Sequence, residues 1–139
     1  MPVSYGKYVP IRLLGKGASG TVYLAQDTFS GTEVALKVLD EAVVTNAAQD
    51  RKRLKQFLNE ASLTGRLSHP HIAAILDAAI GDESGYLALE YVPGGDLSQF
   101  TLPGALLPVG QAIEMAFKSC GALDYAFRQG VIHRDIKPA

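Results

Sequence analysis

The sequence has little cysteine, no excess of charge of one sign and no long apolar run. Its one cysteine, Cys120, cannot close a disulfide within the chain, which favours a reducing compartment. No run approaches the ~18 apolar residues of a membrane-spanning helix, and residues 1–5 lack the layout of a signal peptide. We therefore expect a cytoplasmic protein without a membrane segment.

Positive and negative charges nearly cancel. The 139 residues contain 13 Lys and Arg against 14 Asp and Glu, a formal net charge of -1. This balance argues against a nucleic-acid binder or a membrane-surface protein, because both need an excess of basic residues. Apolar residues at 47% and charged residues at 19% exclude a disordered polyelectrolyte. The length suits one modest domain or a piece of a larger one.

Strand-like and helix-like patterns divide the chain near Gly94 and Gly95. Before this point, runs rich in β-branched and aromatic residues alternate with glycine-containing turns and predict strands. The predicted strands are residues 8–14, 21–25, 33–39, 72–79 and 86–91. A helical apolar period predicts one helix over about 48–67 and another that opens at Pro108, with Gly130 as its C-cap.

A glycine-rich motif, G-x-G-x-x-G, covers residues 15–20. Glycines at this spacing let the backbone approach an anion closely, because no Cβ intervenes. A Walker loop is excluded, since its Lys-Ser/Thr pair is missing. A dinucleotide loop is favoured by Asp40, twenty residues after Gly20, but it requires a helix where the strand-like Thr21-Val22-Tyr23 stands. A glycine loop between two strands fits best, and an ordinary glycine-rich hairpin stays open.

A lysine and a glutamate stand in apolar surroundings. Lys37 lies in the strand-like V-A-L-K, where either face places its ammonium among apolar side chains, and a buried charge needs an opposite charge nearby. Glu60 is the natural partner, because its neighbours on the predicted helix are apolar. A snorkelling lysine and a solvated glutamate remain the alternatives.

The segment 131–138 is the most specific feature. It places His133, Arg134, Asp135 and Lys137 within five residues of one another, after an apolar helix. A carboxylate two residues before a cation suggests a catalytic base beside a phosphate-binding lysine; the alternative is a surface salt-bridge cluster. The extended stretch 89–96 exposes backbone groups that can read a purine edge.

Three other side chains are given structural roles. His69 and His71 have no acidic or cysteine partner at metal-ligand spacing, so we expect turn and packing residues and no metal site. Cys120 lies on the apolar stripe of the last helix and is expected to be a small buried hydrophobe.

Taken together, G-x-G-x-x-G-T-V, V-A-L-K, the helix glutamate and H-R-D-I-K-P resemble the protein-kinase signature in order and spacing. D-x-K-P is similar to the Ser/Thr class, and H-P-H-I-A-A to kinases of this type from bacteria. The resemblance covers nearly the whole chain and implies an α+β fold. A small lobe over 1–92 would have a five-stranded antiparallel sheet plus one main helix, and 93–139 would hold the first helices of an incomplete large lobe.

The resemblance also implies an ATP site. Its glycine loop would cover the phosphates, three apolar side chains would sandwich the adenine, and Lys37, oriented by Glu60, would hold the α- and β-phosphates. The backbone of Glu90 and Val92 would pair with the adenine edge, with Leu89 as gatekeeper. The residues so implied are Leu14, Gly15, Lys16, Gly17, Ala18, Ser19, Gly20, Val22, Ala35, Lys37, Glu60, Glu90 and Val92.

The resemblance implies catalysis by the second lobe. Asp135 would take the proton of a Ser or Thr hydroxyl of a protein substrate, Lys137 would steady the γ-phosphate, and His133 and Arg134 would support the loop. The family's Mg²⁺ is expected, but the sequence stops at Ala139, before the Asn and D-F-G that bind it. We therefore expect these residues alone to be inactive; the alternative is a non-catalytic nucleotide-binding or regulatory, pseudokinase-like module.

The last helix would be left with an apolar stripe that has no partner. The stripe consists of Ile113, Phe117, Leu123 and Phe127. Exposed patches of this kind favour association, so we expect self-association through the helix at 109–129.

Overall fold

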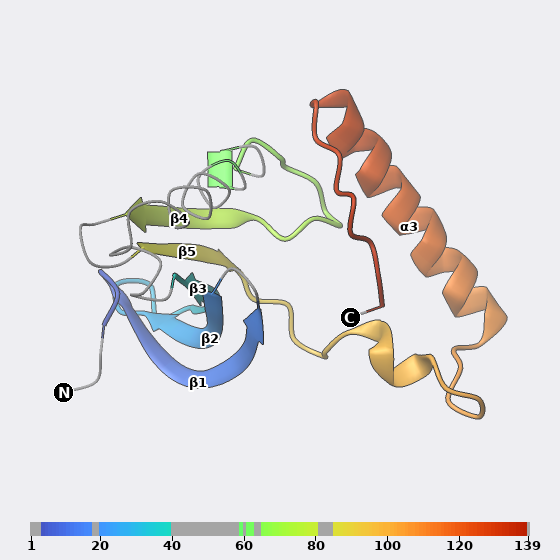
Figure 1. The fold of residues 1–139 in the computed structure, drawn as a ribbon, viewed down its shortest axis with the longest axis horizontal. Coiled ribbons are helices and arrows are strands. Elements are labelled where there is room, and N and C mark those ends of the chain that lie inside the picture. The colour runs from blue at the N-terminus through green and yellow to red at the C-terminus, as the bar shows by residue number, and fades with distance from the viewer. Residues whose placement is uncertain are drawn as a thin grey trace, which may run out of the picture. The chain divides into compact units, whose positions relative to one another are not determined.

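The computed structural model describes residues 4–17, 20–39, 59, 61–62, 65–80 and 85–138. The chain forms two compact units. The first comprises residues 1–66 and 73–91, and the second comprises 67–72 and 92–139. Each unit is described by itself below (Figure 1).

Five strands of the first unit form one antiparallel sheet in the order β1-β2-β3-β5-β4. Their bounds are Tyr8–Gly17 for β1, Gly20–Asp27 for β2, Glu33–Val38 for β3, Ile75–Ile80 for β4 and Gly85–Glu90 for β5. The predicted five-stranded antiparallel sheet is confirmed, and only the strand ends differ. Figure 1 shows β1 curving around β2 at one edge of this sheet.

The β1–β2 connection excludes a dinucleotide loop at the glycine motif. Gly17 pairs with Gly20, and β2 begins at Gly20 as a strand. The helix that a dinucleotide loop requires at this glycine does not form, because Thr21, Val22 and Tyr23 continue the strand that their β-branched and aromatic side chains favour. The motif therefore joins two strands, and both a phosphate-binding glycine loop and an ordinary glycine-rich hairpin fit this arrangement.

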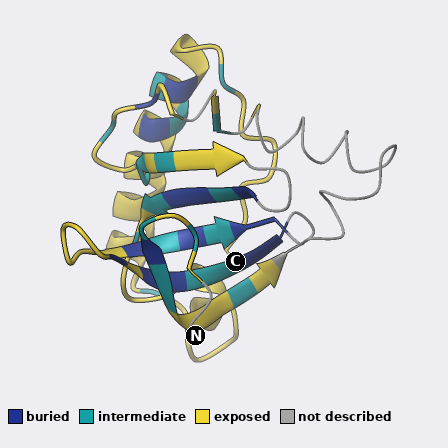
Figure 2. Cartoon of the chain, turned by 90° about the vertical axis from the view of Figure 1, so that its left-hand side faces the viewer, coloured by how far each residue is buried: buried dark blue, intermediate teal, exposed yellow. Residues whose placement is uncertain are grey.

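The register sorts the side chains of the sheet onto two faces, since residues directly opposite each other in an antiparallel pair share a face. One face carries the main core cluster, made of Tyr8, Ala25, Val34, Leu36, Val38 and Ala88. The other face, which we call the Lys37 face, carries Val22, Leu24, Ala35, Lys37, Leu87 and Leu89. Figure 2 shows that burial is deepest along the inner strands.

The β2–β3 turn is held by Asp27. Its Oδ1 accepts the backbone N–H groups of Phe29 at 2.9 Å and Ser30 at 3.3 Å. Gly31 completes the turn with φ 72°, a conformation that favours glycine. The glycine-containing turn predicted between the strands at 21–25 and 33–39 is confirmed. Asp27 Oδ2 also forms an ion pair with Lys7 Nζ at 2.9 Å, which ties the start of β1 to the end of β2.

The Lys7–Asp27 pair predicts an acid-sensitive contribution to stability. The hydrogen bond from Lys7, followed by that from the Phe29 N–H, holds the pKa of Asp27 below its ordinary value. A carboxyl with a lowered folded pKa stabilises the fold above its unfolded pKa of about 3.9 and loses this contribution as the pH falls through the folded pKa. Below about pH 4, the melting temperature of the wild type should therefore fall more steeply than that of Asp27→Asn. Parallel curves from circular dichroism melts would contradict the assignment.

The second unit contains a short 3-10 helix, η1 (Leu97–Phe100), and a long helix, α3 (Val109–Arg128). Asp96 caps η1 by accepting the N–H of Ser98. Pro108 is the N-cap of α3, with φ -53° and ψ 139°, and not its first helical residue as predicted. Its extended ψ keeps it outside the helix, while its carbonyl accepts the first intrahelical bond, from Ala112 N–H at 3.0 Å.

The C-terminal end of α3 is a Schellman motif. Gln129 is the C-cap, and Gly130 follows it with φ 82°, so the prediction that Gly130 is the C-cap is wrong by one residue. The Gly130 N–H donates to Phe127 O at 2.9 Å, and the Val131 N–H donates to Ala126 O at 2.9 Å. These two bonds satisfy carbonyls that the last turn would otherwise leave open.

The apolar stripe of α3 is largely exposed, as expected, and the buried residues of the helix lie beside it. Ala122 and Ala126 are these buried residues. Cys120 is exposed, so its predicted burial is wrong. The stripe itself remains largely open, with Ile113, Phe117 and Phe127 exposed by 64%, 80% and 66% and Leu123 half-buried. Hydrophobic periodicity identified the apolar face of the helix. Within the unit, however, the residues that become buried are the small ones beside this face.

The helix predicted over 48–67 falls mostly outside the described residues. Asn59, Ala61 and Ser62 are helical, and a turn follows at Gly65 and Arg66. Leu67 is buried and lies where the predicted helix was expected to end. Within the part of the chain that the structure describes, no helix combines the length and apolarity needed to cross a membrane.

Candidate functional site

The sheet register gathers most of the residues expected to contact a base on one face. Val22 lies opposite Lys37, and Ala35 lies opposite Leu89, so all four belong to the Lys37 face. Of these four residues, Ala35 has the smallest side chain, which leaves room above the middle of the Lys37 face. Leu14 lies at a β-bulge of β1, between the paired residues Leu13 and Gly15, and is 37% exposed. A β-bulge changes the direction in which a side chain of the strand points, and bulges are common next to functional sites.

Lys37 is the cation of this face. It lies on β3 between Val22 of β2 and Leu87 of β5, and it is half-buried. An ammonium beside apolar neighbours gains more from an anion than one in open water, because the local dielectric constant is lower. Its predicted partner Glu60 lies outside the described residues, as do Ala18 and Ser19 of the glycine motif and Asp40.

The glycines of the motif serve different purposes. At Gly15 a Cβ would meet no atom within 4 Å, so the backbone there borders open space. At Gly20, φ is 141° and a Cβ would lie 2.2 Å from Val38 O. Gly20 is therefore required by the packing of β2 on β3, whereas Gly15 leaves the space that a phosphate would need. Lys16, opposite Thr21, is exposed.

The end of β5 is anchored by Glu90. Its backbone N–H donates to Ala74 O at 2.8 Å, and its carboxylate accepts the Ala74 N–H at 3.2 Å. The next residue, Tyr91, accepts a hydrogen bond through Oη from Arg12 Nη2 at 3.2 Å. Arg12 and Tyr91 were given no role by sequence reasoning, and no sequence pattern pairs residues 79 positions apart. Val92, the first residue after this segment in the second unit, is 62% exposed.

The segment 131–138 of the second unit brings three of its predicted residues together. Asp135 Oδ2 forms an ion pair with Lys137 Nζ at 3.2 Å, and the Asp135 N–H donates to His133 Nδ1 at 3.2 Å. With Nδ1 as acceptor, the ring proton of neutral His133 is on Nε2. The Leu97 N–H donates to Pro138 O at 2.8 Å and ties this segment to η1.

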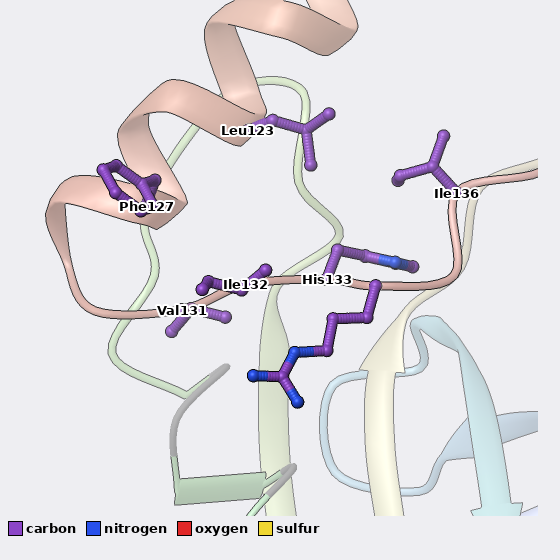
Figure 3. A pocket seen from close by; sticks show the side chains of 7 residues that line it. Leu123, Phe127, Val131, Ile132, His133 and Ile136 are labelled. Carbon is purple, nitrogen blue, oxygen red and sulfur yellow. The ribbon is translucent and has the colours of Figure 1, made fainter.

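Arg134 carries backbone strain that the sequence does not indicate. It has φ 63°, and no other residue that the structure describes, glycine excepted, has a positive φ. This conformation costs an L-residue about 1–2 kcal/mol, and such outliers gather at functional loops. Figure 3 shows His133, the residue before Arg134, at a pocket near the end of α3. The pocket has a volume of about 310 Å³ and is lined by Leu123, Phe127, Val131, Ile132, His133, Arg134 and Ile136.

The two early histidines have the packing role that was predicted. The His71 N–H donates to His69 Nδ1 at 3.0 Å and closes a turn. The His69 ring lies 5.3 Å from that of Tyr125 on α3, whose hydroxyl accepts the Ser68 N–H at 3.1 Å. Sequence reasoning missed Tyr125, because its partners come from a segment far away along the chain.

The candidate residues suit a nucleotide better than a metal. A half-buried ammonium and a glycine that borders open space fit a phosphate group. In contrast, the described part of the chain contains no group of three His, Cys, Asp or Glu side chains placed to hold a metal ion. The carboxylate of Asp135 is already paired with Lys137.

Comparisons with known proteins agree with this geometry. Residues 8–139 match the family model of the protein kinase domain. The chain is 40% identical over 140 residues to serine/threonine-protein kinase PknI of Mycobacterium tuberculosis, covering 99% of this chain and 23% of that protein. It is 32% identical to serine/threonine-protein kinase PrkC of Bacillus subtilis, covering 96% of this chain and 20% of that protein.

The same similarity is found among solved structures. A crystal structure of the Mycobacterium tuberculosis PknI kinase domain superimposes with a TM-score of 0.79 at 38% sequence identity, covering 99% of this chain and 54% of that one. The chain thus spans less than a quarter of these curated relatives and about half of the solved kinase domain.

Proposed function

The chain belongs to the protein kinase family, and on this premise we propose that it carries the ATP-binding lobe and the catalytic loop of a serine/threonine protein kinase. The family transfers the γ-phosphate of ATP to a hydroxyl group of a protein substrate. The observation that carries the proposal is the register of the sheet, which gathers Val22, Ala35, Lys37 and Leu89 on one face. We assign residues 1–92 to the small lobe and 93–139 to the start of the large lobe.

Residues 1–92 bind the nucleotide in this proposal. Val22 and Ala35, with Leu14 from the β1 bulge, supply an apolar surface for the adenine, and the backbone of Glu90 and Val92 pairs with its polar edge. Lys37 neutralises oxygens of the α- and β-phosphates from its half-buried position on β3, and Glu60 orients it. The loop at residues 15–20 covers the phosphates with backbone N–H groups.

The catalytic loop supplies proton transfer and charge. The Asp135 carboxylate accepts the proton of the substrate hydroxyl, for which a carboxylate near the attacking oxygen is required. Lys137 lies 3.2 Å from this carboxylate, so its ammonium can neutralise a phosphate oxygen at the same place. His133 positions Asp135 by accepting its backbone N–H. Arg134, strained at φ 63°, supports the loop.

Location and association are further proposals. One exposed cysteine, Cys120, suits a cytoplasmic location. The exposed residues Ile113, Phe117 and Phe127 form an apolar surface on α3. A polypeptide limited to these 139 residues should self-associate through this surface, because water-exposed apolar patches favour contact.

Nucleotide titration with a lysine variant tests the proposal. By isothermal titration calorimetry, Lys37→Met is expected to weaken ATP binding by roughly 10- to 100-fold, the range for loss of a charged hydrogen bond. Adenosine should bind the variant as it binds the wild type, since it has no phosphates. Lys118→Met, which removes an exposed lysine paired with Glu114 on α3, is the matched control and should change neither affinity.

Three results would separate the alternatives. A wild-type chain that binds neither ATP nor adenosine would overturn the proposed function. Equal loss of ATP and adenosine affinity in Lys37→Met would overturn the role of Lys37 as a phosphate ligand. Normal ATP binding by a full-length protein that phosphorylates no Ser or Thr substrate would favour a non-catalytic regulatory module.

A further inference from the structure

We propose that the hydrogen bond between Arg12 and Tyr91 holds strand β1 over the Lys37 face, and that Arg12 is a positioning residue for the nucleotide. The proposal rests on the proposed function and adds a residue pair that determines how firmly the adenine is covered. Arg12 Nη2 donates to Tyr91 Oη at 3.2 Å, and the two residues are 79 positions apart.

The middle of strand β1 is held less firmly than its start, where Tyr8 is buried in the main core. Strand β1 is an edge strand, paired only with β2. Its pairing is interrupted twice, between Pro10 and Arg12 and between Leu13 and Gly15, so Ile11 and Leu14 have no partner in the register. Ile11, Leu13 and Leu14 are exposed by 55%, 51% and 37%. A strand with few buried contacts and interrupted pairing opens at low cost, so one additional tie in its middle matters.

The bond crosses the face that is proposed to contact the adenine. Arg12 lies opposite Leu24, Leu24 lies opposite Ala35, and Ala35 lies opposite Leu89, so these four form one row across the sheet. Tyr91 comes two residues after Leu89. A bond from Arg12 to Tyr91 therefore joins one end of the row to a residue that lies two positions along the chain from its other end.

The curvature of β1 makes this span possible. In a flat sheet, β1 and β5 would be three strand spacings apart, about 14 Å. That distance is close to the longest that the side chains of an arginine and a tyrosine can bridge with a hydrogen bond. Figure 1 shows that β1 is not straight but curves around β2. The Arg12–Tyr91 bond stabilises this bent form, in which Leu14 follows Arg12 by two residues and precedes Gly15, the partner of Val22.

The bond acts through geometry and not through the charge of Arg12. Tyr91 is its neutral acceptor, and removing only the Tyr91 hydroxyl breaks the bond without changing any charge. Loss of the bond should therefore weaken the binding of a neutral nucleoside and of ATP by the same factor. A long-range attraction between Arg12 and phosphates would instead affect ATP alone.

Titration of the full chain with ATP and with adenosine tests the proposal. Tyr91→Phe and Arg12→Met are each expected to weaken binding of both by roughly 2- to 10-fold, the range of one net hydrogen bond. The double variant should bind no more weakly than either single variant, because both remove the same bond. Affinities are measured well below each variant's unfolding midpoint, so that reduced stability alone leaves them unchanged.

Two control variants match the chemical changes. Tyr23→Phe removes a hydroxyl from the opposite face of the sheet, where Tyr23 lies opposite Leu36 and packs against the main core. Arg66→Met removes an exposed cation elsewhere in the same unit. Neither control should change the affinity for ATP or for adenosine.

The outcomes separate the positioning proposal from the proposed function. Unchanged affinity in Tyr91→Phe, or additive losses in the double variant, would overturn the positioning role while wild-type binding still supports the nucleotide site. A loss confined to ATP in Arg12→Met, with Tyr91→Phe normal, would show an electrostatic effect and also overturn it. A wild-type chain that binds neither ligand would overturn the proposed function, and the positioning role with it.

Discussion

Asp135→Asn in the full-length protein is expected to lower kcat for phosphotransfer by about 10²–10⁴, the range for loss of a general base. Asparagine has nearly the same shape as aspartate but cannot take the proton of the substrate hydroxyl. The backbone N–H that donates to His133 Nδ1 is retained, so the loop should keep its conformation. ATP affinity should change little, because the nucleotide is held by other residues. Initial rates with a protein substrate and calorimetric titration with ATP measure the two effects.

Asp124→Asn is the matched control for this substitution. It removes an exposed carboxylate that forms an ion pair with Arg128 on α3 at 2.9 Å, and it should leave kcat unchanged. An Asp135→Asn protein with wild-type kcat would contradict the role of Asp135. Loss of ATP binding together with turnover would show that the substitution disturbs folding and not proton transfer.

A polypeptide limited to these 139 residues should transfer phosphate at no measurable rate, with or without Asp135. The solved PknI kinase domain is nearly twice as long as the part that this chain matches. Loss of one group that stabilises transition-state charge commonly costs about 10²–10³ in rate, and the described residues contain no metal site. Turnover by this polypeptide that disappears on Asp135→Asn would contradict the expectation.

Gly20→Ala is expected to destabilise the protein by at least about 2 kcal/mol, because it combines backbone strain with overpacking. The new Cβ would lie 2.2 Å from Val38 O, an atom of the β3 backbone that cannot rotate away. The positive φ of 141° adds strain for any residue other than glycine. Urea unfolding followed by circular dichroism measures the loss.

Gly15→Ala is the informative comparison within the same motif. No atom lies within 4 Å of its added Cβ, so stability should change by no more than about 0.5 kcal/mol, as for other open surface positions. Its effect should instead appear as weaker ATP binding, because the Cβ would occupy the space proposed for a phosphate. Equal stability losses in Gly15→Ala and Gly20→Ala would contradict the division of roles between the two glycines.

Local patterns predicted the sheet and much of the site well, for a physical reason. Thr21, Val22 and Tyr23 favour a strand through their own side chains, so they excluded the helix that a dinucleotide loop needs. The alternation of V-A-L-K placed Lys37 on the same side of the strand as Ala35, because side chains of a strand alternate with a period of two. Such information is carried by neighbours along the chain.

Predictions about packing partners were less successful. The apolar stripe of α3 was recognised, yet Cys120 on it is exposed and the buried residues are Ala122 and Ala126. Periodicity shows which side of a helix is apolar, but it does not show which neighbour covers that side. The expected Lys37–Glu60 pair involves a residue outside the described part of the chain and stays a prediction.

The order and types of the strands, the glycine loop between β1 and β2, and the close spacing of His133, Asp135 and Lys137 could be determined from the sequence alone, because each depends on residues within a few positions of one another. The tertiary structure decided which face of the sheet carries Lys37 beside Leu87 and that Arg12 meets Tyr91. It also decided that Arg134 has a positive φ. These features depend on strand pairing, sheet curvature and loop closure, which join residues far apart in the chain and leave no local pattern.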